Sequence, residues 1–409
     1  MGNVGLVTIA GVLVAYAFLS KRLSKTAFTG PLIFMAFGLV AGPTALGWLD
    51  PDAETEVVSL VLEATLILVL FADAFSIDLG GFRDAVRLPG RLLGVGFPLM
   101  VLIGWGAAAW MFPELRGAPA LLVAILLAPT DAALGQAVIS NPRVPARVRN
   151  ALNIESGLND GLALPIFFVV LEAASAAEIG LGGGAVLRAV VVQVLVASLV
   201  GVALGGAAAR FGILAFDRDW AEAGWIQIGL VSVAMAAWAL ADGLGASGFI
   251  AAWVAGLTCG ITGKTRLNRP VDFSEDLGNV LTLISFTLFG ALAVGQALPD
   301  LDIRIVTYAV LSLAVIRMIS VMIATVGSGL APATTLYLGW FGPRGLASII
   351  LVLIVLEDSR VPETPLIAQL MVATVALSVI FHGATAWWGS NRYGDWSSQN
   401  ADPHQRTAE

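Results

Sequence analysis

Four polar residues lie within six positions of each other in the segment NIESGLNDG, residues 153–161. They are Glu155, Ser156, Asn159 and Asp160. The basic run RVPARVRN precedes this segment, and the apolar run LALPIFFVVL follows it closely. If a helix enters a bilayer from the basic run, Asp160 lies roughly 15 Å deep, about half of the ~30 Å hydrocarbon core. Carboxylates at that depth indicate a functional site for a cation or a proton.

The helical spacing arranges these side chains on one face. Around the helix axis, Ser156 and Asp160 lie within about 40° of each other, and so do Glu155 and Asn159. All four side chains fit within an arc of about 140°. Asp160 and Ser156 can therefore offer oxygen atoms to one spot. Glu155 is turned aside, and we expect it to form a structural ion pair with an arginine of a neighbouring helix.

Other ionisable residues fall deep in apolar runs, where each costs about 2.5–3.5 kcal/mol on insertion scales. With the two acids above, the set is Asp73, Asp131, Glu155, Asp160, Arg317 and Arg344. Four acids and two bases leave two formal negative charges. Uncompensated carboxylates in the middle of a membrane would take up protons or a cation, so the set predicts cation or proton binding.

The segment APTDA, residues 128–132, places Asp131 just after Pro129. A proline removes one backbone donor and frees carbonyl groups, so a carbonyl of Pro129 or Thr130 could bind a hard cation. We expect Asp131 and Arg344 to compensate the dipoles of interrupted helices. Both arginines, Arg317 and Arg344, are interpreted as structural counter-charges rather than substrate ligands.

The composition predicts an integral membrane protein. Of 409 residues, 58% are hydrophobic and 12% are charged, whereas soluble domains carry about 25% charged residues. A single cysteine, Cys259, excludes an internal disulfide and a cysteine-cluster metal site. The two histidines, His382 and His404, argue against a histidine-rich site. We expect no cofactor and no nucleic-acid partner, and a lipid bilayer as the surroundings.

Hydropathy predicts thirteen membrane spans, with the first retained in the protein. Of the 22 lysines and arginines, sixteen fall in the loops and tail on one side of this arrangement, three in the loops on the other side and three inside spans. The positive-inside rule then puts the N-terminus outside and the C-terminus in the cytoplasm of a cell (inner) membrane protein. The spans cover residues 4–20, 30–48, 57–77, 92–112, 117–139, 150–171, 184–207, 222–241, 246–261, 277–297, 303–325, 334–356 and 364–388.

The thirteen spans divide into six, one and six, which predicts an all-α fold of two inverted repeats. The first repeat covers 1–183, a linker span lies in 184–221, the second repeat covers 222–388, and 389–409 is a short, disordered cytoplasmic tail. Interrupted helices that cross near the midplane are expected in spans 5 and 12, at Pro129 and Pro343. Inverted repeats with such breaks are an architecture of secondary transporters.

Three motifs, ESGLNDG, APTDA and GPRGLAS, resemble those of the NhaP-type sodium/proton antiporters of the monovalent cation:proton antiporter superfamily, relatives of animal sodium/proton exchangers. The resemblance covers nearly the whole chain. It implies thirteen helices, a homodimer, a dimerisation domain and elevator-like alternating access. We expect spans 3–6 and 10–13 to form the transport core and the remaining spans to form the dimerisation domain.

The resemblance also implies roles for single residues. Asp160 would bind cation and proton in turn, and Ser156, Asp131 and the backbone at Thr130 would complete the site for Na⁺, Li⁺ or K⁺. Asn159 would orient the two aspartates, and Glu155 would pair with Arg317. Asn159 stands where relatives that move two protons have an aspartate, which implies electroneutral one-for-one exchange. Asp73, a further candidate ligand, stands where some close relatives have a glutamate.

Three other functions compete with sodium/proton exchange. A potassium-selective antiporter would use the same residues. A cation channel is a second alternative, although one carboxylate cluster fits a carrier better than a pore with several sites. An intramembrane enzyme is disfavoured, because neither histidine is predicted near the centre of a span, where it could pair with a serine. We therefore predict a transporter and not an enzyme.

Overall fold

The computed structural model describes residues 3–23, 25–49, 55–77, 87–115, 117–179, 183–267, 271–357, 361 and 363–400. All regular secondary structure in these residues is helical, and none of them forms a strand. The main α-helices are α1 (Asn3–Leu23), α2 (Gly30–Ala41), α3 (Thr55–Ser76), α5 (Arg87–Arg91), α6 (Phe97–Met111), α7 (Ala118–Leu126), α8 (Ala132–Ile139), α9 (Ala146–Ile179), α10 (Gly183–Asp217), α11 (Ala223–Gly243), α12 (Gly248–Leu267), α13 (Val271–Leu288), α14 (Gly295–Ala297), α15 (Ile303–Val310), α16 (Arg317–Ala324), α17 (Pro332–Trp340), α18 (Leu346–Glu357) and α19 (Thr364–Asn400).

The structure confirms the predicted all-α membrane fold, because each predicted span overlaps one helix or consecutive helices. Within the described residues, 8 helices are long and apolar enough to cross a membrane. Several predicted ends are wrong: α9 ends at Ile179 and not at residue 171, and α10 ends at Asp217 and not at residue 207. The second span was expected to reach residue 48, but α2 ends at Ala41, where Gly42 and Pro43 follow. The last helix, α19, runs twelve residues beyond the predicted end at residue 388.

The expected disorder of the tail is corrected up to Asn400, and residues 401–409 lie outside the described part of the chain. The extension of α19 is held by aromatic packing on α17. The Tyr393 ring stacks on Tyr337 with 4.0 Å between centroids, and the Tyr393 hydroxyl lies 2.9 Å from Thr334 Oγ1. A further hydrogen bond of 2.9 Å joins the Tyr337 hydroxyl to Ser390. These contacts explain why a polar sequence is helical here.

Two helices are interrupted where prolines were expected to break them. The first interruption separates α7 from α8 at residues 127–131, and the second separates α17 from α18 at 341–345. The two breaks meet, because the Asp131 amide donates to the Pro343 carbonyl at 2.8 Å. Each break therefore places irregular backbone inside the protein, where such backbone is tolerated at membrane depth.

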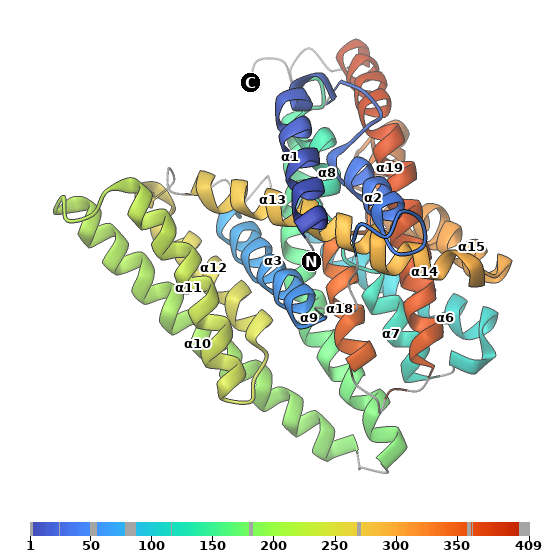
Figure 1. Cartoon of the computed structure of the whole chain (residues 1–409), viewed down its shortest axis with the longest axis horizontal. Helices are drawn as coiled ribbons and strands as arrows, with labels where there is room; N and C mark the ends of the chain where they lie inside the picture. Colours follow the sequence, from blue (N-terminus) through green and yellow to red (C-terminus); the bar gives the residue numbers. More distant parts are fainter. Residues whose placement is uncertain are drawn as a thin grey trace.

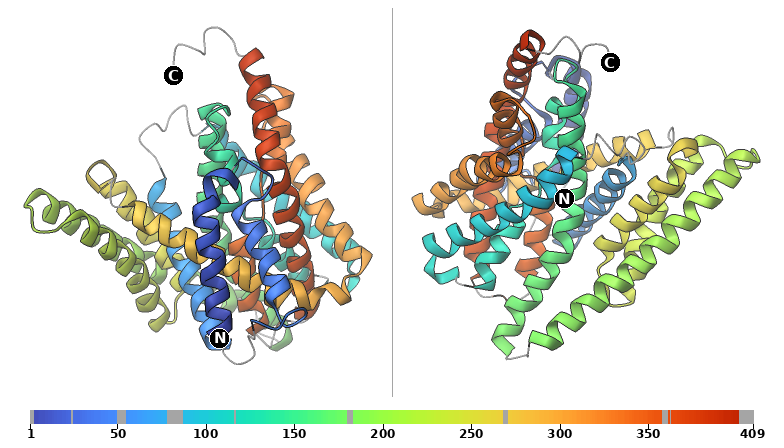
Figure 2. Two further views of the ribbon diagram at one scale, coloured as in Figure 1. Left: turned by 45° about the horizontal axis from the view of Figure 1, so that its top comes forward. Right: turned by 180° about the vertical axis from the view of Figure 1, so that it is seen from behind.

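Helices α10, α11 and α12 pack side by side and lie apart from α6, α7 and α15 (Figure 1). Helix α12 packs on its other face against α3. Glycines allow the close approach, since a side chain on Gly256 would overlap the Phe71 carbonyl of α3. The same backbone packing occurs between α2 and α13, where Gly38 meets the Thr287 carbonyl. Both views in Figure 2 agree with this arrangement.

Matching features recur seven spans apart along the chain. The pair α3–α12 joins spans 3 and 9, and the pair α13–α2 joins spans 10 and 2. A π-helical turn at Leu92–Gly96 in span 4 has a counterpart at Leu311–Ile316 in span 11. The two interrupted helices are spans 5 and 12. These correspondences are those expected of a chain built from two inverted repeats.

Candidate ion-binding site

Helix α9 carries the four polar residues of the segment 153–161 into the interior of the protein. Their exposed fractions are 4% for Glu155, 4% for Ser156, 1% for Asn159 and 8% for Asp160. Such burial of polar groups is costly unless each finds a partner. The partners of these side chains therefore indicate which residues are structural and which are available to a ligand.

Two residues of α9 hold the break between α7 and α8. The Ser156 hydroxyl donates to the Thr130 carbonyl at 2.6 Å, and the Asn159 amide donates to the Thr130 hydroxyl at 2.6 Å. Thr130 itself is buried. The extended segment before α8 is thus tied to α9 next to Asp160, so carbonyl, hydroxyl and carboxylate oxygens gather in one region.

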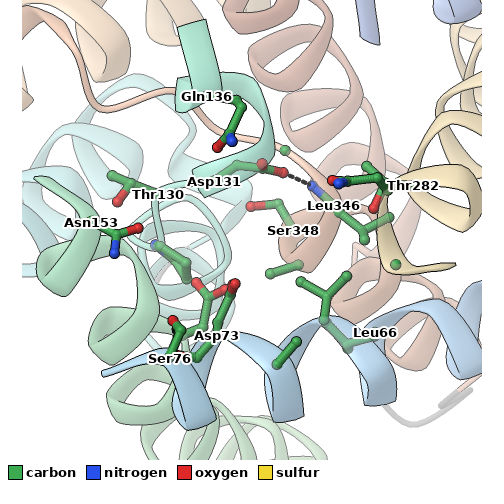
Figure 3. Close-up of a pocket in the computed structure, with 18 of the residues that line it drawn as sticks. Leu66, Asp73, Ser76, Thr130, Asp131, Gln136, Asn153, Thr282, Leu346 and Ser348 are labelled. Atoms are coloured by element: carbon green, nitrogen blue, oxygen red, sulfur yellow. Dashed lines mark hydrogen bonds between the residues drawn. The ribbon is translucent and has the colours of Figure 1, made fainter. Parts of the chain in front are cut away.

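Asp131 joins the first residues of two half-helices. Its Oδ1 accepts from the Leu134 amide of α8 at 2.9 Å, and its Oδ2 accepts from the Leu346 amide of α18 at 2.7 Å (Figure 3). Both amides belong to helix N-termini, where a negative charge is stabilised by unpaired N–H groups and by the helix dipole. Gly345 must lack a side chain, because a Cβ there would overlap the Asp131 carboxylate.

The Arg344 side chain lies at the C-terminal end of the half-helix α7. Its Nη1 donates to the carbonyls of Ala128 and Pro129, the latter at 3.0 Å, just beyond the last residue of α7. The side chain is completely buried. A cation at the C-terminal end of a half-helix offsets the partial negative charge of its free carbonyls. The crossing thus contains a fixed negative charge at its two N-terminal ends and a fixed positive charge at a C-terminal end.

Glu155 and Arg317 form a buried ion pair, with Arg317 Nη1 2.6 Å from Glu155 Oε1 and Nη2 3.0 Å from Oε2. Arg317 Nη2 also lies 3.4 Å from the Leu338 carbonyl near the end of α17. A Cβ on Gly342 would overlap the Arg317 guanidinium, so a glycine is required beside the pair. Arg344 is not the partner of Glu155 in this structure.

Asp160 differs from Glu155 and Asp131 in its hydrogen bonds. Its Oδ1 is enclosed and has no hydrogen-bond partner within the described residues. The side chain lines a cavity of about 240 Å³, together with Asp73 of α3, Thr130 and Asp131. Figure 3 shows Asp73 and Ser76 on the side of this cavity opposite Asp131. A cation or a proton at Asp160 would supply the missing partner.

Six further residues that line the cavity are uncharged and polar, and the sequence did not single them out. Asn153 alone carried a signal, since it precedes Asp160 by seven residues and therefore shares its helix face. The cavity extends toward the N-terminal end of α9, because it reaches the last residues of α3 and α8, Ser76 and Ile139. This end of the molecule carries the arginine-rich loop. The uncharged polar residues are Ser76, Gln136, Asn153, Asn279, Thr282 and Ser348.

A serine–histidine pair is present in α19, contrary to expectation. Ser378 Oγ lies 3.1 Å from His382 Nδ1, and it accepts the Arg344 backbone amide at 2.6 Å. The helix extends to Asn400, so His382 lies near its middle and not near its end. Both side chains are buried and neither lines the cavity. The pair therefore supports the second break, as Ser156 supports the first.

The chain is similar to known transport proteins. Residues 9–388 match the family described as sodium/hydrogen exchanger, transmembrane. A Na(+)/H(+) antiporter of Saccharomyces cerevisiae is 34% identical over 161 residues, covering 35% of this chain and 16% of that protein. The K(+)/H(+) antiporter NhaP of Alkalimonas amylolytica is 23% identical over 354 residues, covering 86% and 60%.

Solved structures show the same fold. The sodium proton antiporter MjNhaP1 from Methanocaldococcus jannaschii at pH 8 superimposes with a TM-score of 0.79 at 21% identity, covering 95% of this chain and 98% of that one. The chain spans 60% or less of the length of the curated relatives compared above. The match over residues 9–388, together with the two crossed breaks, identifies the chain as a member of the transmembrane sodium/hydrogen exchanger family.

Proposed function

We propose that this protein is a secondary antiporter that exchanges a monovalent cation for a proton at Asp160. The observation that supports this is that the acids of this region differ in their partners. Glu155 is paired with Arg317, and Asp131 accepts two backbone amides, whereas Asp160 Oδ1 has no partner in the described residues. A buried carboxylate without a partner is energetically costly, so binding of a cation or a proton at that carboxylate is favoured.

The ion would be held by oxygen atoms around Asp160. Candidate ligands are the carboxylates of Asp160 and Asp131, the Ser156 hydroxyl and the Thr130 carbonyl. The hydrogen bond between Ser156 and Thr130 leaves a lone pair on each oxygen, so both remain able to contact a cation. Asp73 lines the same cavity from α3 and is a further candidate.

Na⁺ is the proposed cation, with Li⁺ and K⁺ as alternatives. The names of the relatives support both sodium and potassium, since the yeast protein is a Na(+)/H(+) antiporter and the Alkalimonas protein a K(+)/H(+) antiporter. Each is a hard cation that accepts oxygen ligands. Because Asn159 is an amide bonded to Thr130, it carries no titratable proton, and we propose electroneutral one-for-one exchange.

Transport would proceed by an elevator-like movement of a core against a static unit. The core would contain α6 to α9 and α15 to α19, which are spans 4–6 and 11–13, and the static unit would contain α1, α2 and α10–α12. The close backbone packing of α3 on α12 and of α13 on α2 favours placing α3 and α13 in the static unit, although spans 3 and 10 were expected in the core. The cavity would then lie between the two units.

We further propose a homodimer in the cell (inner) membrane, with the N-terminus outside and the C-terminus cytoplasmic. The distribution of lysine and arginine supports the orientation. Exposed apolar side chains on α10, such as Leu195, Leu199 and Val202, support contact with lipid or with a second copy.

The proposal can be tested by flux in proteoliposomes. A pH gradient is imposed, and Na⁺, K⁺ or Li⁺ is added in turn while the internal pH is followed with a fluorescent dye. The expected result is saturable, cation-dependent collapse of the gradient. Cation flux that does not depend on the proton gradient would indicate a channel and would overturn the antiporter assignment.

A further inference from the structure

Trp253 of α12 lies against α9 directly behind the ion-binding face. Its indole Nε1 donates to the Gly157 carbonyl at 3.2 Å. The ring covers Gly161, the residue after Asp160, so closely that a Cβ at Gly161 would overlap it. Two glycines one helical turn apart therefore form the surface that the indole contacts.

We propose that Trp253 is a positioning residue that holds α9 at one of two depths, one helical turn apart. We call these two arrangements of the indole on α9 seats. In the observed seat the ring lies on Gly161, and the indole N–H donates to the Gly157 carbonyl. In the second seat the ring would lie on Gly157, and the N–H would reach the carbonyl of Asn153. This inference rests on the alternating-access function proposed above.

The direction of movement follows from the cavity. It opens toward the N-terminal end of α9, so opening on the opposite side requires the core to move along α9 toward its C-terminal end. A shift of about 6 Å, four residues at 1.5 Å each, with a rotation of about 40°, would bring Gly157 to the place that Gly161 now occupies opposite the indole. Asp160 would move by the same amount and would then face the other side of the membrane.

Helix α12 is well placed to be the fixed partner. Gly201 and Gly205 of α10 pack directly on the carbonyls of Ala251 and Ala255 of α12, and neither position has room for a side chain. The backbone on both sides of Trp253 is therefore locked to the longest helix of the proposed static unit. The indole meets the proposed core at a surface of glycine, which offers little resistance to sliding.

The two glycines differ in a way that makes the proposal testable. The nearest atoms to a Cβ on Gly157 would be those of Asp73, at 3.5 to 3.8 Å, which is ordinary van der Waals contact. Gly157→Ala is therefore compatible with the observed seat but would obstruct the second one. Gly161→Ala is incompatible with the observed seat, because its methyl group would overlap the ring, and it would favour the second one.

The experiment measures which state each variant populates. Cys259, which is buried in α12, is replaced by alanine, and Asn279→Cys at the cavity is the reporter. The rate of modification by a water-soluble maleimide is compared in purified full-length protein. Gly157→Ala should keep the reporter at least as reactive as in the parent and should lower cation-driven proton flux about tenfold or more, because one state is lost. Gly161→Ala should lower the reactivity of the reporter.

Matched controls distinguish the effect of the Trp253 contact from the general effect of replacing a helical glycine by alanine. Gly229→Ala in α11 is the same substitution in open space, with no atom within 4 Å of the new Cβ, and it should change neither reactivity nor flux. Gly161→Ala combined with Trp253→Ala should recover reactivity, because the obstruction is gone. If Gly161→Ala alone does not fold, Gly157→Ala and the double variant decide the outcome.

Two results would overturn the inference. One is a change of reporter reactivity in the same direction in Gly157→Ala and Gly161→Ala. The other is that both variants leave reactivity and flux unchanged, as Gly229→Ala should. The test is separate from that of the proposed function. If the unmodified protein shows no coupled flux but the two glycine variants still shift reporter reactivity in opposite directions, antiport alone is overturned. If coupled flux is normal but the two variants do not shift reactivity in opposite directions, the role of Trp253 alone is overturned.

Discussion

The guanidinium of Arg317 faces the carboxylate of Glu155 with two hydrogen bonds, at 2.6 and 3.0 Å, in a region where both side chains are at most 5% exposed. The pair joins α9 to α16, and through the Leu338 carbonyl it also reaches α17. Two parallel hydrogen bonds of this kind fix distance and orientation together. The contact therefore holds α9 against the second interrupted helix.

Removing one member of this pair should destabilise the protein. Glu155→Ala leaves a buried, unpaired arginine, which typically costs about 3–5 kcal/mol. The expected result is a lower unfolding temperature in detergent. The double variant Glu155→Ala/Arg317→Ala should recover part of this loss. Arg304→Ala, at an exposed ion pair, is the control and should change little. Fully additive losses would contradict the coupling.

Asp160→Asn should abolish exchange and leave the fold intact. The amide cannot alternate between a proton and a cation, yet it has nearly the same size and removes a buried negative charge. Flux in proteoliposomes and the unfolding temperature are measured on the same preparation. Substantial cation-dependent proton flux in a folded Asp160→Asn variant would show that another group carries the proton.

Gly345→Ala should damage the crossing, because its methyl group would overlap the Asp131 carboxylate that accepts from Leu134 and Leu346. Losing charge-assisted hydrogen bonds of this kind costs about 1.5–3 kcal/mol each. We expect a lower unfolding temperature and impaired cation-driven flux. Gly135→Ala is the matched control in α8, since its Cβ would meet only Ile139 at 3.6 Å. Equal effects of the two substitutions would argue against a special role for the space at Gly345.

If one carboxylate, Asp160, trades one proton for one monovalent cation, as proposed, exchange should be electroneutral. The Asn159 side chain is an uncharged amide, hydrogen-bonded to Thr130, that cannot exchange a proton in the transport cycle. Glu155 is paired with Arg317. In proteoliposomes clamped with potassium and valinomycin, the sodium gradient that stops proton flux should equal the proton gradient at every voltage. A null point that moves with voltage would reveal a second proton, with Asp131 or Asp73 as its carrier.

The sequence predicted the fold class and the helix breaks well, because both depend on local patterns. Apolar runs, proline positions and the charge of the loops are all properties of short segments. The polar face of α9 was also readable, since Ser156 and Asp160 follow helical spacing. The partners of these residues were less accessible, because they come from distant parts of the chain.

Asp131 illustrates the limit. The sequence indicated an acid beside a break, but it did not reveal that the Leu346 amide, 215 residues away, donates to it. Thr282 and Asn279 were missed because single neutral residues in an apolar span carry no recognisable pattern. The end of α19 was misjudged for the opposite reason: its polar composition predicted disorder, while stacking of Tyr393 on Tyr337 depends on a residue from another helix.

The reciprocal capping of the two breaks has a consequence for biosynthesis. The carbonyls at the end of α7 are hydrogen-bonded by Arg344, and the second oxygen of Asp131 accepts from the Leu346 amide. The ribosome makes both of these partners more than 200 residues later. A nascent chain that has inserted only its first half therefore contains an unfinished break in the membrane. The hydrogen bonds that join the two breaks form only when α18 enters, so this crossing is among the last parts of the fold to assemble during membrane insertion.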